Sequence, residues 1–171
     1  MVDYPNPRLE ARGYALMATR RALTQTLTGL DDAVLWQPIA ALDSLGGLAR
    51  EAWQQEFYWL WPPEIPAPRI DPEPPLTGVL YALIRHRGVT EEMLMRSEDP
   101  DLDKVYVSES RMREDAEPRT LSAILDAVMQ GELFAAGRAQ TLRSVLEPDW
   151  EGSRESWDNA VEAVAASRSD G

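Results

Sequence analysis

The stretch from residue 121 to residue 146, LSAILDAVMQGELFAAGRAQTLRSVL, carries the longest helical pattern in the chain. Residues three or four apart share one face of a helix, and the stretch is long enough for about seven turns. The apolar residues at these steps are Leu121, Leu125, Val128, Ala135, Ala139, Leu142 and Leu146. Glu132 falls on the same face, and small residues lie around it at 131 and 135–137. We therefore expect a buried helix whose narrow centre leaves room for a neighbouring helix or a pocket.

Two more helices are expected in the first third of the chain. Asn6 followed by Pro7 is a common helix start, and leucines then repeat every seven residues for about 20 residues, until Gly29 ends the pattern. Either Asp43 or Ser44 can cap a second helix, which continues to the prolines that begin at residue 62.

A third helix is expected from about residue 76 to residue 96, with Gly88 as a weak point. Its apolar residues are Val79, Leu80, Leu83, Ile84 and Leu94. Thr120, which follows Pro118, can cap the long helix described first. Four long helices with long connections predict an all-α fold, a four-helix bundle.

The connections and the C-terminus have their own patterns. Residues 62–75 contain so many prolines that we expect a stiff, extended crossover strapped over the bundle. Residues 97–118 are acidic, and the run at 104–107 could form a small hairpin or an ordered loop. We expect the bundle domain to cover residues 1–150. Residues 151–171 are expected to form an extension with a short helix and an end that frays from Ser167.

Composition limits the classes of partner and site. The chain of 171 residues has 17 basic and 29 acidic side chains, a net charge of −12, which disfavours binding to nucleic acid or to an anionic membrane. It has no cysteine, hence no thiolate metal site and no disulfide. No long apolar run and no secretory signal are visible, so we expect a cytoplasmic protein.

Three passages together carry a resemblance to a known family. They are LTGLDDAVLWQPI at 27–39, SLGGLAREAWQQEFYWL at 44–60 and ELFAAGRAQTLR at 132–143. They resemble corresponding passages of the DinB/YfiT-like family, helix-bundle proteins described as metal-dependent enzymes. The resemblance covers roughly residues 8–146 and implies a DinB/YfiT-like four-helix bundle, which in this family commonly pairs into homodimers.

The resemblance also implies where the metal site of the family would lie. In that family the second helix carries a histidine and a glutamate, and the last helix carries two histidines four residues apart. The histidine positions fall here on Glu51, Gly131 and Ala135, the glutamate falls on Glu56, and Arg138 replaces a glutamine. Glycine and alanine have no donor atoms, so we expect no metal and no other cofactor. If the register were shifted by one residue, Glu132 could join Glu51, but two carboxylates suit only a weak site for a hard cation.

Glu132 is the most informative residue, because a buried carboxylate must be paired or protonated. One interpretation is an ion pair with Arg20, Arg50 or Arg138. A second is a polar pocket in which Glu51, Glu56 and Glu132 meet an arginine. A third is a shifted helix that leaves Glu132 exposed.

Two other features are given structural interpretations. His86, the single histidine of the chain, lies between two arginines, and we expect it on the surface. The aromatic residues between Trp53 and Trp61 are expected in the core or at a dimer interface rather than in a box that stacks a ligand.

Two functions are compatible with these patterns. The first is a non-catalytic or small-ligand-binding homodimer with a degenerate, metal-free site. The alternative is an enzyme, a transferase or hydrolase, that uses a pocket of carboxylates and arginine. An open pocket that holds a carboxylate of raised pKa would favour the enzyme, whereas a filled cavity would favour the first function.

Overall fold

A computed structural model of the chain describes residues 4, 6–39, 43–61, 64–106, 118–152 and 154–169. Its elements in chain order are α1 (Pro7–Leu27), α2 (Asp32–Leu35), α3 (Leu45–Leu60), α4 (Leu76–Met95), the 3-10 helix η1 (Asp99–Asp103), β1 (Val105–Tyr106), β2 (Arg119–Thr120), α5 (Leu121–Leu146) and α6 (Arg154–Ser169). The predicted all-α fold class is confirmed. Within the described ranges, no helix combines the length and the apolar character needed to cross a membrane.

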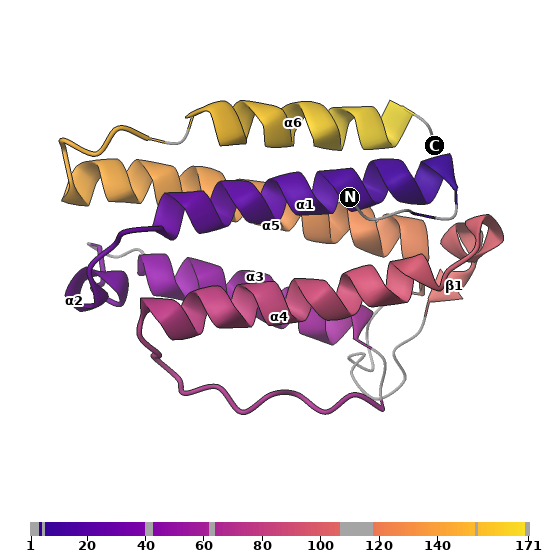
Figure 1. Ribbon diagram of the computed structural model, residues 1–171, viewed down its shortest axis with the longest axis horizontal. Helices are drawn as coiled ribbons and strands as arrows, with labels where there is room; N and C mark the ends of the chain where they lie inside the picture. The colour runs from indigo at the N-terminus through magenta and orange to yellow at the C-terminus, as the bar shows by residue number, and fades with distance from the viewer. Residues whose placement is uncertain are drawn as a thin grey trace.

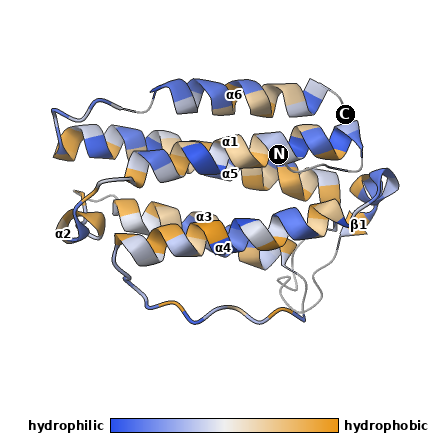
Figure 2. Ribbon diagram, viewed as in Figure 1, coloured by the Kyte–Doolittle hydropathy of each residue, from blue (hydrophilic) through white to orange (hydrophobic). Residues whose placement is uncertain are grey.

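The long helices run side by side along the molecule (Figure 1). Helix α1 packs against α4 and α5, and α3 likewise packs against α4 and α5, so each of these four helices touches two of the others. Helix α6 lies outside, on α1 and α5. In Figure 2, α6 carries more hydrophilic residues than α3 and α4, as expected for a helix with one face against the protein.

Two apolar clusters fill the space between the helices. One includes Leu23 of α1, Leu48 of α3, Leu83 of α4 and Ala136 of α5. The other includes Leu16, Leu60, Leu94 and Met129 of the same four helices. Each helix passes from one cluster to the other at a buried charged residue, and these residues are Arg20, Glu56, Arg87 and Glu132.

Three predicted helix starts are confirmed by hydrogen bonds. The side chain of Asn6 accepts one from Leu9 N at 3.0 Å, that of Ser44 from Gly47 N at 3.0 Å, and that of Thr120 from Ala123 N at 3.1 Å. In each case a side-chain oxygen satisfies an N–H group that has no partner within the helix.

Helix α4 differs from its prediction in two ways. It continues through Gly88, the expected weak point, without a break. Of its expected apolar residues, Val79, Leu83 and Leu94 are fully buried, but Ile84 is 66% exposed, and the polar residues His86, Arg87 and Thr90 are buried instead. This mixed face is turned inward because carboxylates on α3 and α5 form ion pairs with Arg87.

Residues 64–75 of the proline-rich segment form an extended crossover, as predicted, while residues 62 and 63 lie outside the described residues. Residues 64–75 run along the outside of α3 and α4 without regular structure (Figure 1). Their C-terminal half is fixed by hydrogen bonds from Trp36 Nε1 to the Pro74 carbonyl at 2.7 Å and from Arg50 to the Pro72 carbonyl at 2.8 Å. We refer to residues 64–75 as the strap.

The remaining predictions are met in part. Strand β1 of the acidic segment pairs antiparallel with β2, which directly follows that segment. Residues 107–117 lie outside the described residues. Helix α6 is 16 residues long, not short, and it includes Ser167 to Ser169, which were expected to fray. Helix α2, which lies in the first connection, was not predicted.

Candidate functional site

Four buried charges meet in one cluster, to which α1 contributes Arg20, α3 Glu56, α4 Arg87 and α5 Glu132. Arg20 Nη2 lies 2.6 Å from Glu56 Oε2 and 2.7 Å from Glu132 Oε2. Arg87 Nε lies 2.8 Å from Glu56 Oε1, and Arg87 Nη2 lies 2.7 Å from Glu132 Oε2. Each carboxylate therefore touches both arginines. We call these four residues the charged core.

Further hydrogen bonds complete the charged core. The hydroxyl of Thr90 donates to Glu56 Oε1 at 2.6 Å. Arg20 also donates to the carbonyl of Leu83, and Arg87 donates to the carbonyl of Leu16. The four charged side chains are at most 7% exposed. The charges are thus paired and bonded in a region that excludes water.

The pKa values follow from this pairing. Burial alone would raise the pKa of Glu56, but the charges of Arg87 and Arg20 and the hydrogen bond from Thr90 outweigh it and lower the pKa from 4.5 to about 2. Burial alone would lower the pKa of Arg20, whereas Glu132 and Glu56 raise it. A general acid or base needs a pKa near the working pH. Glu56 and Arg20 hold fixed charges instead, so the charged core is suited to structure rather than to proton transfer.

The ion pair between Glu132 and Arg20 is the first of the interpretations offered for Glu132. The other two arginines offered as partners lie elsewhere. Arg50 bonds the strap and lies over the ring of Trp36 at 5.1 Å, and Arg138 lies over the ring of Phe134 at 5.7 Å. Sequence reasoning missed Arg87 and Thr90. Arg87 lies four residues after Leu83, and Thr90 lies four residues before Leu94. This helical spacing from buried leucines is the signal that indicates their position.

The other expected site residues border a small pocket between α3 and α5. Its volume is about 140 Å³, and its lining residues are Leu48, Glu51, Ala52, Gln55, Gly131, Phe134, Ala135 and Arg138. We call it the α3–α5 pocket. A Cβ atom at Gly131 would lie only 2.8 Å from Gln55 Oε1, so Gln55 fills the space in front of this glycine. Seven residues were expected at the site. Glu51, Gly131, Ala135 and Arg138 border the pocket, whereas Arg20, Glu56 and Glu132 belong to the charged core.

The donor atoms of the α3–α5 pocket do not fit the divalent ion of the resembled family. The pocket offers the carboxylate of Glu51 and the amide of Gln55, and the guanidinium of Arg138 would repel a cation. Zinc and similar ions prefer imidazole or thiolate ligands, which this pocket lacks. In the part of the chain that the structure describes, no three His, Cys, Asp or Glu residues are grouped to hold a metal ion.

The expectation for His86 was wrong, because this residue is only 2% exposed. Its ring centroid lies 4.8 Å from that of Trp61 and 6.3 Å from those of Trp53 and Phe57. Its Nδ1 atom lies 2.7 Å from the carbonyl of Ala82, which can only accept, so Nδ1 carries the proton. Burial lowers the pKa of His86, mainly because the charged form loses its hydration. Of the aromatic residues, Trp53 and Trp61 are in the core, as one interpretation held, whereas Tyr58 is 54% exposed.

Comparisons with protein-family models, with curated proteins and with solved structures gave no match for this chain.

Proposed function

We propose that this chain is a non-catalytic four-helix bundle of the DinB/YfiT-like type, built from α1, α3, α4 and α5, whose degenerate site binds a small polar ligand instead of a metal ion. The observation that carries the proposal is the charged core. Its two carboxylates are bonded to two arginines and closed to solvent, so they are not free to act on a substrate. The same observation weighs against the alternative of an enzyme that uses carboxylate and arginine groups in the core.

The α3–α5 pocket supports the ligand-binding part of this proposal. Glu51, Gln55 and Arg138 present a negative, a neutral and a positive hydrogen-bonding group around one small volume. Such a set suits a small molecule that carries both donors and acceptors. The resemblance places the former histidine positions at Glu51, Gly131 and Ala135, all of which border this pocket.

Restoring the three imidazoles tests both the resemblance and the loss of the metal site. The variant that combines Glu51→His, Gly131→His and Ala135→His is expected to bind one zinc or nickel ion per chain and to melt at a higher temperature when either ion is added. The parent protein is expected to hold no stoichiometric metal and to show no shift. The side chain of Gln55 lies nearest to a side chain added at position 131, and it is long enough to move aside.

Elemental mass spectrometry and thermal melting measure these outcomes. A matched control carries Gly131→Ser and Ala135→Ser, which change size and polarity there without adding imidazole. Stoichiometric metal in the parent would overturn the proposal of a degenerate site. Failure of the folded triple variant to bind metal would show that the three positions do not converge as the resemblance implies.

We also propose that the protein is a homodimer that pairs through the exposed face of α4. Tyr81, Ile84 and Met95 are 63%, 66% and 49% exposed on this face. Their steps of three and eleven residues place them on one stripe with Gly88, where an added Cβ would meet no atom within 4 Å. We call these four residues the α4 stripe.

The charges beside the α4 stripe are self-complementary. If two copies of α4 cross antiparallel at Gly88, Tyr81 of one copy faces Met95 of the other, and Arg85 lies at the same height as Glu91 of the other copy. Neither Arg85 nor Glu91 forms an ion pair with another residue in the described ranges. Opposite charges at such flanking positions favour one partner and one orientation of pairing.

Ile84→Lys is therefore expected to convert the dimer to a monomer, as measured by analytical ultracentrifugation. Arg85→Glu is expected to weaken the dimer by about tenfold, and the double variant with Glu91→Arg is expected to restore it, because the charges are then exchanged. Val145→Lys is the matched control, since Val145 of α5 is 65% exposed but lies off the stripe. A monomeric parent, or a dimer broken equally by Val145→Lys, would contradict pairing through α4.

A further inference from the structure

A second cavity lies between the strap and a different face of α3. Its volume is about 230 Å³, and its lining residues are Arg50, Trp53, Gln54, Phe57, Tyr58 and His86 from the helices and Ala67, Pro68, Ile70, Asp71 and Pro72 from the strap. None of these residues borders the α3–α5 pocket. The two cavities are therefore separate. We call it the strap cavity.

We propose that the strap cavity is a binding site for a small aromatic carboxylate. Its lining includes the aromatic side chains of Trp53, Phe57 and Tyr58 on the helix side and two prolines on the strap side. Flat rings stack favourably on such surfaces. The volume is below the roughly 300 Å³ at which cavities for drug-sized ligands begin, so the ligand is limited to about one substituted ring.

Arg50 gives the cavity its preference for a carboxylate. Its guanidinium is held in place by the 2.8 Å bond to the Pro72 carbonyl and by the ring of Trp36, which lies 5.1 Å away. These contacts use one N–H group and one face of the guanidinium, which carries five N–H donors in total. No carboxylate in the described ranges forms an ion pair with Arg50, so its charge is available to a ligand.

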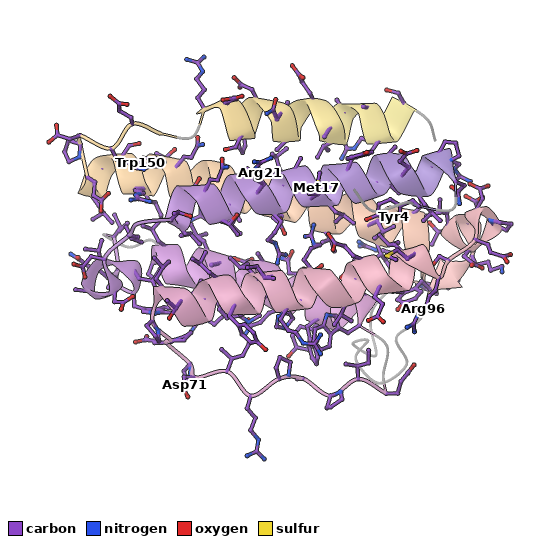
Figure 3. All side chains as sticks on the ribbon, viewed as in Figure 1. Tyr4, Met17, Arg21, Asp71, Arg96 and Trp150 are labelled. Atoms are coloured by element: carbon purple, nitrogen blue, oxygen red, sulfur yellow. The ribbon has the colours of Figure 1, made fainter. Side chains whose placement is uncertain are left out.

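The other groups that line the cavity are compatible with an anion. Asp71 contributes to the wall from the strap, but Figure 3 shows its side chain directed away from the helices. His86 adds a second recognition element. Because its Nδ1–H group is committed to Ala82, its Nε2 atom has a lone pair and can accept from a hydroxyl or an N–H group. A ring that carries a carboxylate for Arg50 and a hydroxyl for His86, such as 4-hydroxybenzoate, matches both residues.

The single histidine makes this proposal testable in the whole protein. The nitrogen and ring-proton resonances of His86 can be followed by NMR without overlap from other imidazoles, because the chain contains only this one. Adding 4-hydroxybenzoate is expected to shift these resonances in a saturable manner, with a dissociation constant on the order of 1 mM or below. Benzoate, without the hydroxyl, is expected to bind more weakly, and 4-hydroxybenzamide, without the charge, more weakly still.

Arg50→Gln is expected to weaken the binding of 4-hydroxybenzoate by at least tenfold and to leave that of 4-hydroxybenzamide unchanged, because a charge-assisted hydrogen bond is lost only with the carboxylate. The matched control is Arg69→Gln, which removes an exposed strap arginine that does not border the cavity. Equal affinity for the carboxylate in Arg50→Gln and in the parent would overturn the assigned role of Arg50. No saturable shift of the His86 resonances with any of the three probes would overturn the site.

Discussion

Replacing Glu132 by glutamine is expected to lower the free energy of unfolding by about 3 kcal/mol or more at neutral pH. The substitution leaves Arg20 and Arg87 with Glu56 as their one shared carboxylate, inside a region where all four side chains are at most 7% exposed. An unbalanced charge cannot recover its lost hydration there. Because domains of this size are stable by about 5–15 kcal/mol, the loss is a large part of the total.

Urea denaturation measures this loss, and the matched control is Glu162→Gln on the exposed face of α6, which should change stability by no more than about 0.5 kcal/mol. A second variant keeps the test informative if Glu132→Gln does not fold. Replacing all four members of the charged core by Met and Leu removes every charge together and is expected to be less damaging than the single change. If the fourfold variant were the less stable of the two, pairing of the charges would not be the main effect.

Acid is expected to destabilise the protein through Glu56 over a defined range. Its pKa is about 2 in the folded protein, against 4.5 for the free side chain. Since the folded value is the lower one, the stabilisation is complete above pH 4.5 and is lost as the pH falls from 4.5 towards 2. At about 1.4 kcal/mol for each pH unit, the loss is on the order of 3 kcal/mol.

The comparison of the parent with Glu56→Gln isolates this effect. Exposed carboxylates such as Asp101 and Asp103, whose pKa values are lowered by Lys104 and Arg8, contribute equally to both proteins and cancel in the difference. The stability gap between parent and variant, measured by urea denaturation at several pH values, is expected to be constant above pH 5 and to shrink by about 3 kcal/mol towards pH 2. A gap that does not change with pH would contradict the low pKa of Glu56.

Sequence reasoning succeeded where the deciding interaction is local. The caps at Asn6, Ser44 and Thr120 each depend on a residue within three positions, so the sequence contains both partners. The buried position of Glu132 could also be predicted, because α5 has one clear apolar face. A buried carboxylate needs a cation, and Arg20 was one of the three arginines named as possible partners.

Sequence reasoning named the buried apolar residues of α4 but missed the buried polar residues between them. Leu80 and Ile84 form one apolar stripe, and Val79 and Leu83 begin another that continues through Arg87. The second is buried because carboxylates on α3 and α5 offset the cost of burying Arg87, and these partners are 31 and 45 residues away in sequence. The burial of His86 was missed for the same reason, since it turns inward together with Arg87.

The charged core also restricts the mutational routes open to this sequence. Each of the four helices supplies one member, and each member bonds two members of opposite sign. A single substitution to an apolar residue leaves an odd charge inside the protein, whereas a protein that has lost all four is expected to be stable again. A charged interior and an apolar interior are therefore separated by unstable intermediates. A lineage that carries this network can leave it only through coupled changes on two or more helices, so drift elsewhere in the chain would alter the surface long before it altered the centre.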